Sequence, residues 1–336
     1  MNADENRLNQ DFEARNSKPK IRKSLQLGGL LIFLLGLSLL VAALLGSEKL
    51  SFFELNEQQT AILFDIRLPR VFLGATVGAS LALAGASLQS LLRNPLAEPY
   101  LLGVSNGAAL GTMLAFVFFS QFEWARPVMA FAGASLATFV VYQMAKSRAG
   151  MNVERLVLAG VIVTTFLSSI IVLMTSLIDA TKLRSFTFWL LGDLSQSTKN
   201  GFYLSLAAVL IGSFVLMRRA RALNLMMIGE RDAFDFGVEV YKTRLAVFAT
   251  SSLLVGTSVA ASGSVGYVGL IVPHLVRLAI GSDNRLVIPF SALAGAIFVV
   301  LADTVARVAI APRELPVGAI TALIGAPLFI YLLRKN

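Results

Sequence analysis

The chain has 336 residues, of which 56% are hydrophobic and 15% are charged, and its mean hydropathy is +0.73. Soluble globular domains carry about 25% charged residues, so this composition excludes a soluble fold. The formal net charge is +9 and there is no cysteine, which excludes disulfides and thiolate metal sites.

Apolar runs long enough to cross a bilayer recur along the whole length of the chain. They lie near residues 27–46, 71–92, 101–119, 128–145, 156–178, 202–217, 245–261, 265–280, 286–303 and 317–333. Runs of this length favour helices over the short alternating strands of an outer-membrane barrel. The sequence therefore predicts an all-α polytopic membrane protein of about ten transmembrane helices. We expect a polar, basic arm over residues 1–24 and one transmembrane domain over residues 25–336.

Lysine and arginine are concentrated in the segments that share a side with the N-terminus. By the positive-inside rule this asymmetry predicts that both termini are cytoplasmic, and it explains the basic charge without nucleic acid. The first apolar run could be a signal peptide. Its polar leader and the run itself are longer than usual, which favours a retained span. We expect the arm only to set orientation near anionic lipid.

Between residues 85 and 111, two segments rich in small residues meet at a short polar break. Pro95 and Pro99 remove backbone donors there and disfavour helix just before them. Glycines then recur every four residues at Gly103, Gly107 and Gly111. The preceding span has a similar close-packing face at Gly74, Gly78 and Gly85. The break with its glycines is consistent either with a packed membrane hairpin or with a functional hinge.

Charged residues mark the second and ninth spans. Arg67 and Arg70 bracket a proline at the expected outer start of the second span. They are typical of snorkelling interface anchors, and they could also form a docking point for an acidic partner. Asp303 and Arg307 in the ninth span are four residues apart and so share one helical face. Because charge at membrane depth is costly, we expect this pair to face protein or water and to bind each other.

Two connecting segments are long. The outer segment 179–200 exceeds a tight turn, and we expect it to fold back on the mouth of the protein. The inner loop 218–244 interleaves apolar and charged residues, which predicts one or two short amphipathic helices on the cytoplasmic face. Its mixed charge favours a protein partner over an anionic membrane.

The sequence contains no P-loop, no H-E-x-x-H and no G-x-S-x-G motif, so it predicts no catalytic, cofactor-binding or metal-binding residue. His274, the only histidine, has no carboxylate nearby in sequence and is expected to be structural. Pro273 is expected to interrupt the eighth helix. Apart from Asp303, no acidic residue lies clearly within a span, which argues against a secondary transporter driven by ions.

Six ordered blocks resemble the permease subunits of bacterial type II ABC importers for ferric siderophores, haem and cobalamin. They are RLPR at 67–70, NPLAEPYLLGVSNGAALG at 94–111, GERDAFDFGVEV at 229–240, GSVGYVGLIVPHLVR at 263–277, LADTVAR at 301–307 and APRELPVGAITALIGAPLFIYLL at 311–333. The likeness covers about residues 25–336.

This resemblance implies a permease homodimer in the bacterial inner membrane, with two copies of a cytoplasmic ABC ATPase and a periplasmic or lipid-anchored binding protein. The chain itself would not be an enzyme, because ATP hydrolysis resides in the partner subunit. The family's docking arginines correspond to Arg67, Arg70 and Arg307. Its ATPase-coupling residues correspond to Gly229, Glu230, Asp232, Ala233 and Gly237. Position 236 is Phe, where the family often has Leu.

We therefore expect an importer that moves a bulky metal chelate by alternating access. Residues expected to act as hinges or packing points are Pro95, Pro99, Gly103, Gly107, Gly111 and Pro273. The alternatives are an ion-coupled secondary transporter and a membrane-embedded enzyme. The motifs do not separate siderophore, haem and cobalamin, although two blocks look somewhat more like cobalamin importers.

Overall fold

The computed structural model describes residues 25–46, 56–147, 150–196 and 198–335. The predicted arm over 1–24 lies outside these ranges. Within them the chain is helical apart from turns and one antiparallel pair of two-residue strands, β1 (Lys146–Ser147) and β2 (Gly150–Met151). The predicted all-α class is confirmed.

Seven helices in the described part of the chain are long and apolar enough to cross a membrane. They are Leu25–Leu44, the continuous stretch Glu57–Leu92, α5 (Ala125–Ala145), α6 (Val153–Thr175), α8 (Lys199–Ile228), α10 (Val240–Ser262) and α12 (Asn284–Val308). Three shorter apolar helices are α4 (Val104–Phe118), α11 (Val268–Ile280) and α13 (Val317–Lys335). Together they agree with the predicted ten crossings.

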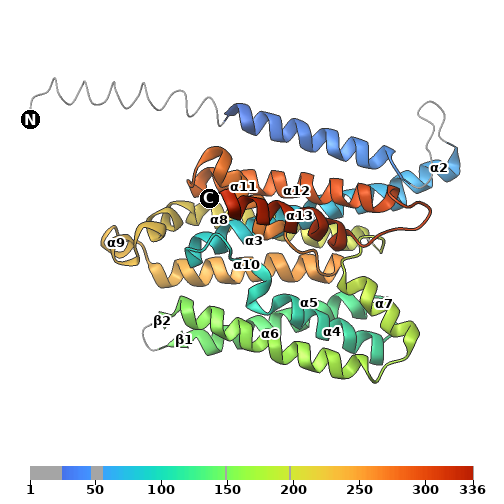
Figure 1. Ribbon diagram of the computed structural model, residues 1–336, viewed down its shortest axis with the longest axis horizontal. Helices are drawn as coiled ribbons and strands as arrows, with labels where there is room; N and C mark the ends of the chain where they lie inside the picture. Colours follow the sequence, from blue (N-terminus) through green and yellow to red (C-terminus); the bar gives the residue numbers. More distant parts are fainter. Residues whose placement is uncertain (1–24, 47–55, 148–149, 197, 336) are drawn as a thin grey trace, which may run out of the picture.

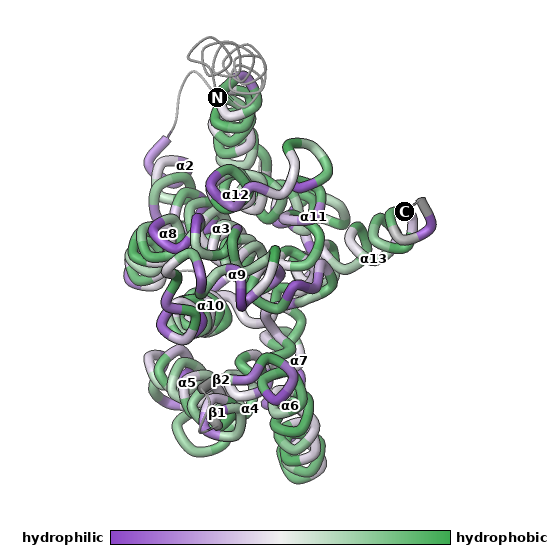
Figure 2. Tube along the Cα trace, turned by 90° about the vertical axis from the view of Figure 1, so that its left-hand side faces the viewer, coloured by the Kyte–Doolittle hydropathy of each residue, from purple (hydrophilic) through white to green (hydrophobic). Residues whose placement is uncertain are grey.

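The helices run roughly side by side, as Figure 1 shows, and several described segments share one end of the bundle. The helix that begins at Leu25 starts there, α13 ends there, and α9 (Glu230–Asp235) and the strands β1 and β2 lie there too. Figure 2 looks onto this end and shows hydrophilic segments around α8, α9 and α10 against largely apolar helix walls. The described part of the chain therefore begins and ends on one side of the bundle, which agrees with an even number of crossings.

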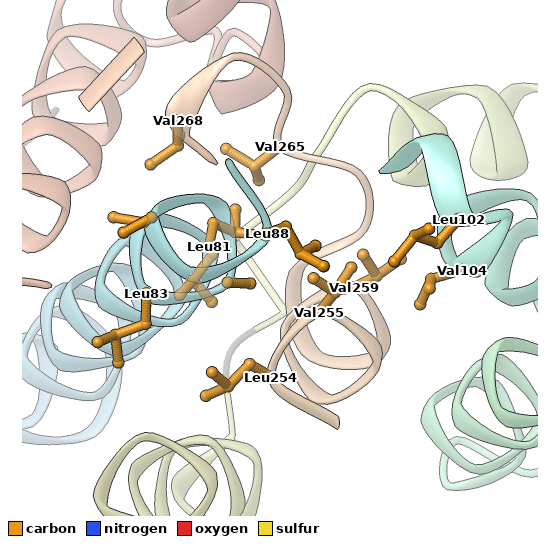
Figure 3. Packing of buried hydrophobic residues seen from close by; sticks show 14 of the residues in the cluster. Leu81, Leu83, Leu88, Leu102, Val104, Leu254, Val255, Val259, Val265 and Val268 are labelled. Atoms are coloured by element: carbon orange, nitrogen blue, oxygen red, sulfur yellow. The ribbon is translucent and has the colours of Figure 1, made fainter. Parts of the chain in front are cut away.

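Helix α3 (Leu68–Leu92) forms the centre of the bundle, and nearly all its residues are buried. A helix that is apolar all round is expected to be surrounded by other helices. It packs against α8, α10, α11 and α12. Figure 3 shows Leu81 and Leu88 of α3 close to Val255 and Val259 of α10.

Most of the predicted close-packing glycines are points of close helix contact, although Gly103 precedes α4 and lies against the Val163 side chain of α6. In α3, Gly78 packs on the backbone of Gly295 in α12. In α4, Gly107 packs on the backbone of Gly133 in α5, and Gly111 packs one turn away on Met129. A Cβ atom at Gly78, Gly107 or Gly111 would overlap a backbone carbonyl, so the small residue permits the helices to approach this closely.

The second span does not begin at its proline, so that part of the prediction is wrong. Helix α2 (Glu57–Ala61) continues through a π-helical segment, Ile62–Arg67, directly into α3. Pro69 cannot donate a backbone hydrogen bond, and a π-helical turn accommodates such an irregularity. Here the N–H of Leu68 donates to the carbonyl of Leu63, five residues back.

The expected interruption at Pro273 is also wrong, because α11 is continuous through it. Proline leaves the carbonyl four residues earlier, that of Gly269, without its helical donor. Gln89 of α3 supplies a replacement: its Nε2 donates to Gly269 at 3.3 Å and to Leu270 at 3.0 Å. A neighbouring side chain therefore satisfies the freed backbone group, as intramembrane prolines require.

Candidate functional site

Three predicted docking residues meet at the end of the bundle opposite α9. Arg67, Arg70 and Arg307 are only 5%, 6% and 4% exposed. Arg70 Nε donates to Oδ1 of Asp303 at 3.0 Å, and its Nη1 donates to Oε2 of Glu314 at 2.7 Å. Arg307 Nε donates to the other oxygen of Asp303 at 3.0 Å. The predicted pairing of Asp303 with Arg307 is confirmed, and it forms part of a larger network.

The same arginines hold the last turn of the first helix. Arg67 Nη1 donates to the carbonyl of Leu44 at 3.0 Å. Arg307 donates to the carbonyls of Ala42 and Leu45, both at 2.9 Å. Terminal helix carbonyls lack partners within the helix and carry partial negative charge, so guanidinium groups stabilise them. These arginines are therefore buried residues that bind the end of the first helix, and not snorkelling anchors at the membrane interface. Their docking role stays a prediction.

The segment between α8 and α10 is shorter than the inner loop predicted over 218–244. Helix α8 continues to Ile228, and α10 begins at Val240. Only α9 and its flanking turns connect them. Gly237, with φ of +79°, ends α9: its N–H donates to Phe234, and the next N–H, of Val238, donates to Ala233. This pair of bonds is a Schellman motif, which explains the glycine there.

Helix α9 has one buried and one exposed face. Ala233 is fully buried against the bundle, whereas Phe234 and Phe236 are 71% and 74% exposed. Large exposed aromatic side chains beside charged ones are typical of a protein-binding surface. Of the predicted coupling residues, Ala233 faces inward, and Glu230 lies in the first turn of α9.

Glu230 connects α9 to three other elements. Its carboxylate lies 3.6 Å from the guanidinium of Arg93, at the end of α3, and pairs with Arg244 of α10. Arg244 in turn donates to the backbone carbonyl of Met151 in β2. Glu230 therefore contacts the end of α3 and α10 directly, and β2 through Arg244.

The polar break turns back into the bundle. After Arg93, the chain forms a 3-10 turn, Pro99–Leu102, and then α4. The carbonyl of Leu101 packs on Gly160 of α6. Since Gly160 is seven residues into α6, the break reaches about 10 Å inside the end of that helix. Pro99 is buried and lies in this re-entrant segment, whereas Pro95 lies in the exposed turn that precedes it.

The segment that follows α3 carries one carboxyl group, that of Glu98. Glu98 Oε1 accepts the N–H of Tyr267 at 3.1 Å. Tyr100 donates its hydroxyl to the carbonyl of Val265 at 2.9 Å and accepts the N–H of the same residue at 3.0 Å. Glu98 lies in the break between α3 and the 3-10 turn, outside the candidate spans, but its carboxyl group is directed inward to Tyr267. No local pattern distinguishes a re-entrant acid from one in a surface turn.

The outer segment folds back as expected. Helix α7 (Ala180–Leu190) follows α6, and the turn after it is bonded to two distant segments. The N–H of Val317 donates to the carbonyl of Gly192 at 3.0 Å, and the N–H of Asp193 donates to Ser262 at 2.8 Å.

His274 stands edge-on to Phe329, with ring centroids 6.5 Å apart, which fits the structural role expected of it. The described residues contain no group of three or more side chains that could hold a metal ion.

Residues 30–335 match the model of the FecCD transport family. The chain belongs to the FecCD transport family. A cobalamin import system permease protein, BtuC of Halobacterium salinarum, is 44% identical over 84% of this chain and 76% of its own length. The hemin transport system permease protein HmuU of Yersinia pestis is 37% identical over 94% of this chain and 97% of its own.

Structural comparison agrees with the FecCD assignment. A solved structure described as an inward-facing candidate metal-chelate type ABC transporter matches with a TM-score of 0.84 at 34% identity. The match covers 92% of this chain and 99% of that one. The resemblance drawn from the six sequence blocks is confirmed: this FecCD protein is a multi-pass ABC transporter permease.

Proposed function

We propose that this FecCD permease imports a bulky metal chelate across the bacterial inner membrane by alternating access. In this proposal two copies form a homodimer, two cytoplasmic ABC ATPases drive it, and a periplasmic or lipid-anchored protein delivers the cargo. The chain carries out no bond chemistry itself. The cargo class follows from the relatives, whose names specify cobalamin, hemin and metal chelates.

The surface around α9 is the observation that carries the proposal. It presents Phe234 and Phe236 to solvent beside the acidic residues Asp232 and Asp235. An ATPase that docks here would bury the two aromatic rings. In this proposal the movement of the ATPase is transmitted from Glu230 to Arg93, and from Arg93 to the re-entrant segment that follows it.

The re-entrant segment is the proposed moving part. It is short, its one helical element is the 3-10 turn Pro99–Leu102, and Gly103 with φ of +75° joins it to α4. The tight glycine contacts of α4 with α5 let these helices move together as one unit. Pro95, Pro99 and Gly103 are then hinge positions, while Gly107 and Gly111 are packing positions.

The outer arginine cluster, formed by Arg67, Arg70 and Arg307, is the proposed docking surface for the binding protein. Glu314, whose side chain is 38% exposed, forms its rim over the buried Arg70. Arg67 and Arg307 act in this proposal by holding the outer surface in shape, and any direct ion pair with the partner requires the end of the first helix to move aside.

Transport in reconstituted vesicles tests the proposal. The permease is reconstituted with the ATPase and binding protein from its own operon, and uptake of cobalamin, haem and a ferric siderophore is measured. We expect uptake of one class that requires ATP and all three components. Uptake by the permease alone under a proton or sodium gradient would instead support the ion-coupled alternative.

A further inference from the structure

A cleft of about 320 Å³ lies between α5 and α10, which Figures 1 and 2 show side by side. Aromatic and aliphatic side chains form most of its walls: Phe131, Phe139, Phe248, Leu245 and Leu253. Three lining residues, Ser135, Phe139 and Ala249, are exposed, so the cleft opens on the outside of the bundle. Neither the coupling surface around α9 nor the outer arginine cluster includes it.

The dimensions of the cleft match one leaflet of a membrane. Its lining on α5 extends from Phe131 to Tyr142, and the eleven helical steps between these residues correspond to about 16 Å along the helix. The hydrocarbon core of a bilayer is about 30 Å thick, so one leaflet contributes about half of that. The cleft ends at Tyr142, close to the cytoplasmic end of α5, and therefore lies in the cytoplasmic leaflet of the predicted orientation.

Polar and basic groups gather at the cytoplasmic end of the cleft. The hydroxyls of Tyr142 and Tyr241 are 3.1 Å apart. Lys146, which is exposed and follows the last residue of α5, acts electrostatically on Tyr241. The other nearby lysine, Lys242, is paired with Glu239 at 2.6 Å. Tyrosine and lysine at this level are typical partners of lipid headgroups.

We propose that this cleft binds one acyl chain of an anionic phospholipid of the cytoplasmic leaflet. The apolar walls hold the chain, and Lys146 with the hydroxyls of Tyr142 and Tyr241 binds the phosphate. The combination of an apolar cleft one leaflet long with a cationic end matches a phospholipid. A second copy of the chain in the cleft would not require the cation of Lys146 at the cytoplasmic end, whereas a lipid phosphate would.

Retention of lipid by the purified full-length chain tests this proposal. The chain is exchanged into detergent with radiolabelled phosphatidylglycerol or phosphatidylcholine, passed through gel filtration and analysed by native mass spectrometry. We expect one retained phosphatidylglycerol per chain and weaker retention of phosphatidylcholine. Equal retention of the two lipids, or replacement of both by detergent, would overturn the proposal.

Filling the cleft should displace the lipid. Ala249 is exposed and lines the cleft, so Ala249→Trp occupies it without disturbing the core. Loss of two or three buried methylenes reduces retention about tenfold or more. Ala207→Trp, on an exposed position of α8 outside the cleft, is the matched control and should retain lipid as the parent does. Thermal unfolding shows whether Ala249→Trp is folded, and Ser135→Phe replaces it as the test if it is not. A folded variant of either kind that retains as much lipid as the parent would contradict the proposal.

The headgroup end has its own test. Lys146→Gln should reduce the preference for phosphatidylglycerol over phosphatidylcholine, whereas Lys182→Gln, at the other end of the bundle, should not. An unchanged preference in Lys146→Gln argues against the phosphate site.

Because the chain has no cysteine, Ser135→Cys also reports directly whether a second copy covers the cleft. A disulfide-linked dimer in membranes would assign the cleft to a protein interface and overturn the lipid assignment.

Discussion

Arg70 of α3 and Asp303 of α12 form a buried ion pair across 233 positions of sequence, with Nε and Oδ1 3.0 Å apart. Asp303 uses its second oxygen for Arg307, so one carboxylate serves two buried guanidinium groups. Through these arginines the pair joins α3, α12 and the end of the first helix. The cluster therefore fixes the outer end of the bundle.

Removal of this carboxylate should be costly. Asp303→Asn leaves Arg70 and Arg307 without their shared charge, and breaking a buried pair lowers the free energy of unfolding by about 3–5 kcal/mol. The control is Asp65→Asn, whose pair with Lys199 is 63% exposed on both sides and should contribute less than about 1 kcal/mol. Thermal unfolding in detergent measures both. Equal losses in the two variants would show that the cluster does not stabilise the fold.

The docking role of the arginine cluster can be separated from its structural role. Arg67→Gln and Arg307→Gln should weaken binding of the operon's binding protein to the reconstituted permease about fivefold or more. Arg184→Gln, an exposed arginine on α7 outside the cluster, is the matched control. Affinity is measured by surface plasmon resonance on variants that pass a thermal-unfolding check. Unchanged affinity in a folded double variant would remove the docking assignment.

Close packing of α4 on α5 gives a prediction about glycine. Gly107→Ala places a Cβ against the backbone of Gly133 and the side chain of Ala137, and we expect it to lower the free energy of unfolding by about 1–3 kcal/mol. Gly36→Ala, in the first helix with nothing within 4 Å, should be neutral or stabilising by up to about 1 kcal/mol. Denaturation of the two variants in the same detergent compares them. A tolerant Gly107→Ala would mean that α4 and α5 are free to separate.

Glu230 should couple ATP hydrolysis to transport. Glu230→Gln removes the charge that binds Arg93 and Arg244, so we expect substrate moved per ATP hydrolysed to fall about fivefold or more. Reversal of charge in Glu230→Lys or Asp232→Lys should uncouple ATP hydrolysis from transport more strongly. Asp235→Asn, on the same short helix, is the control. Normal stoichiometry in the Glu230 variants would place coupling elsewhere.

Acid stability should depend on Asp283, which caps α12. Its hydrogen bond with Arg285 is the main cause that lowers its pKa from 3.8 to about 2, and Asn224 adds a second bond. A lowered pKa in the folded state stabilises the protein above pH 3.8, and this contribution is lost as pH falls through about 2. Asp283→Asn should therefore be less stable than the parent at pH 5, and the two should converge near pH 2. A constant difference across this range would exclude the ionised carboxylate as the cause.

Local sequence features determined the class of this protein. Hydropathy over about 20 residues identifies a span without reference to any other segment, and helical periodicity alone places Asp303 and Arg307 on one face. The ordered blocks identified the family for the same reason, since each is a short continuous motif. The glycine faces of α3 and α4 likewise followed from their spacing.

Contacts between distant segments were decided only by the tertiary structure. The sequence does not indicate that Gln89 satisfies the carbonyl freed by Pro273, nor that Arg70 shares Asp303 with Arg307. The sequence indicates a polar break around Glu98, and only the packing of Leu101 on α6 shows that the chain turns into the bundle after it. Burial and pairing of polar groups depend on which helices become neighbours, and that choice is made by the packing of the whole chain.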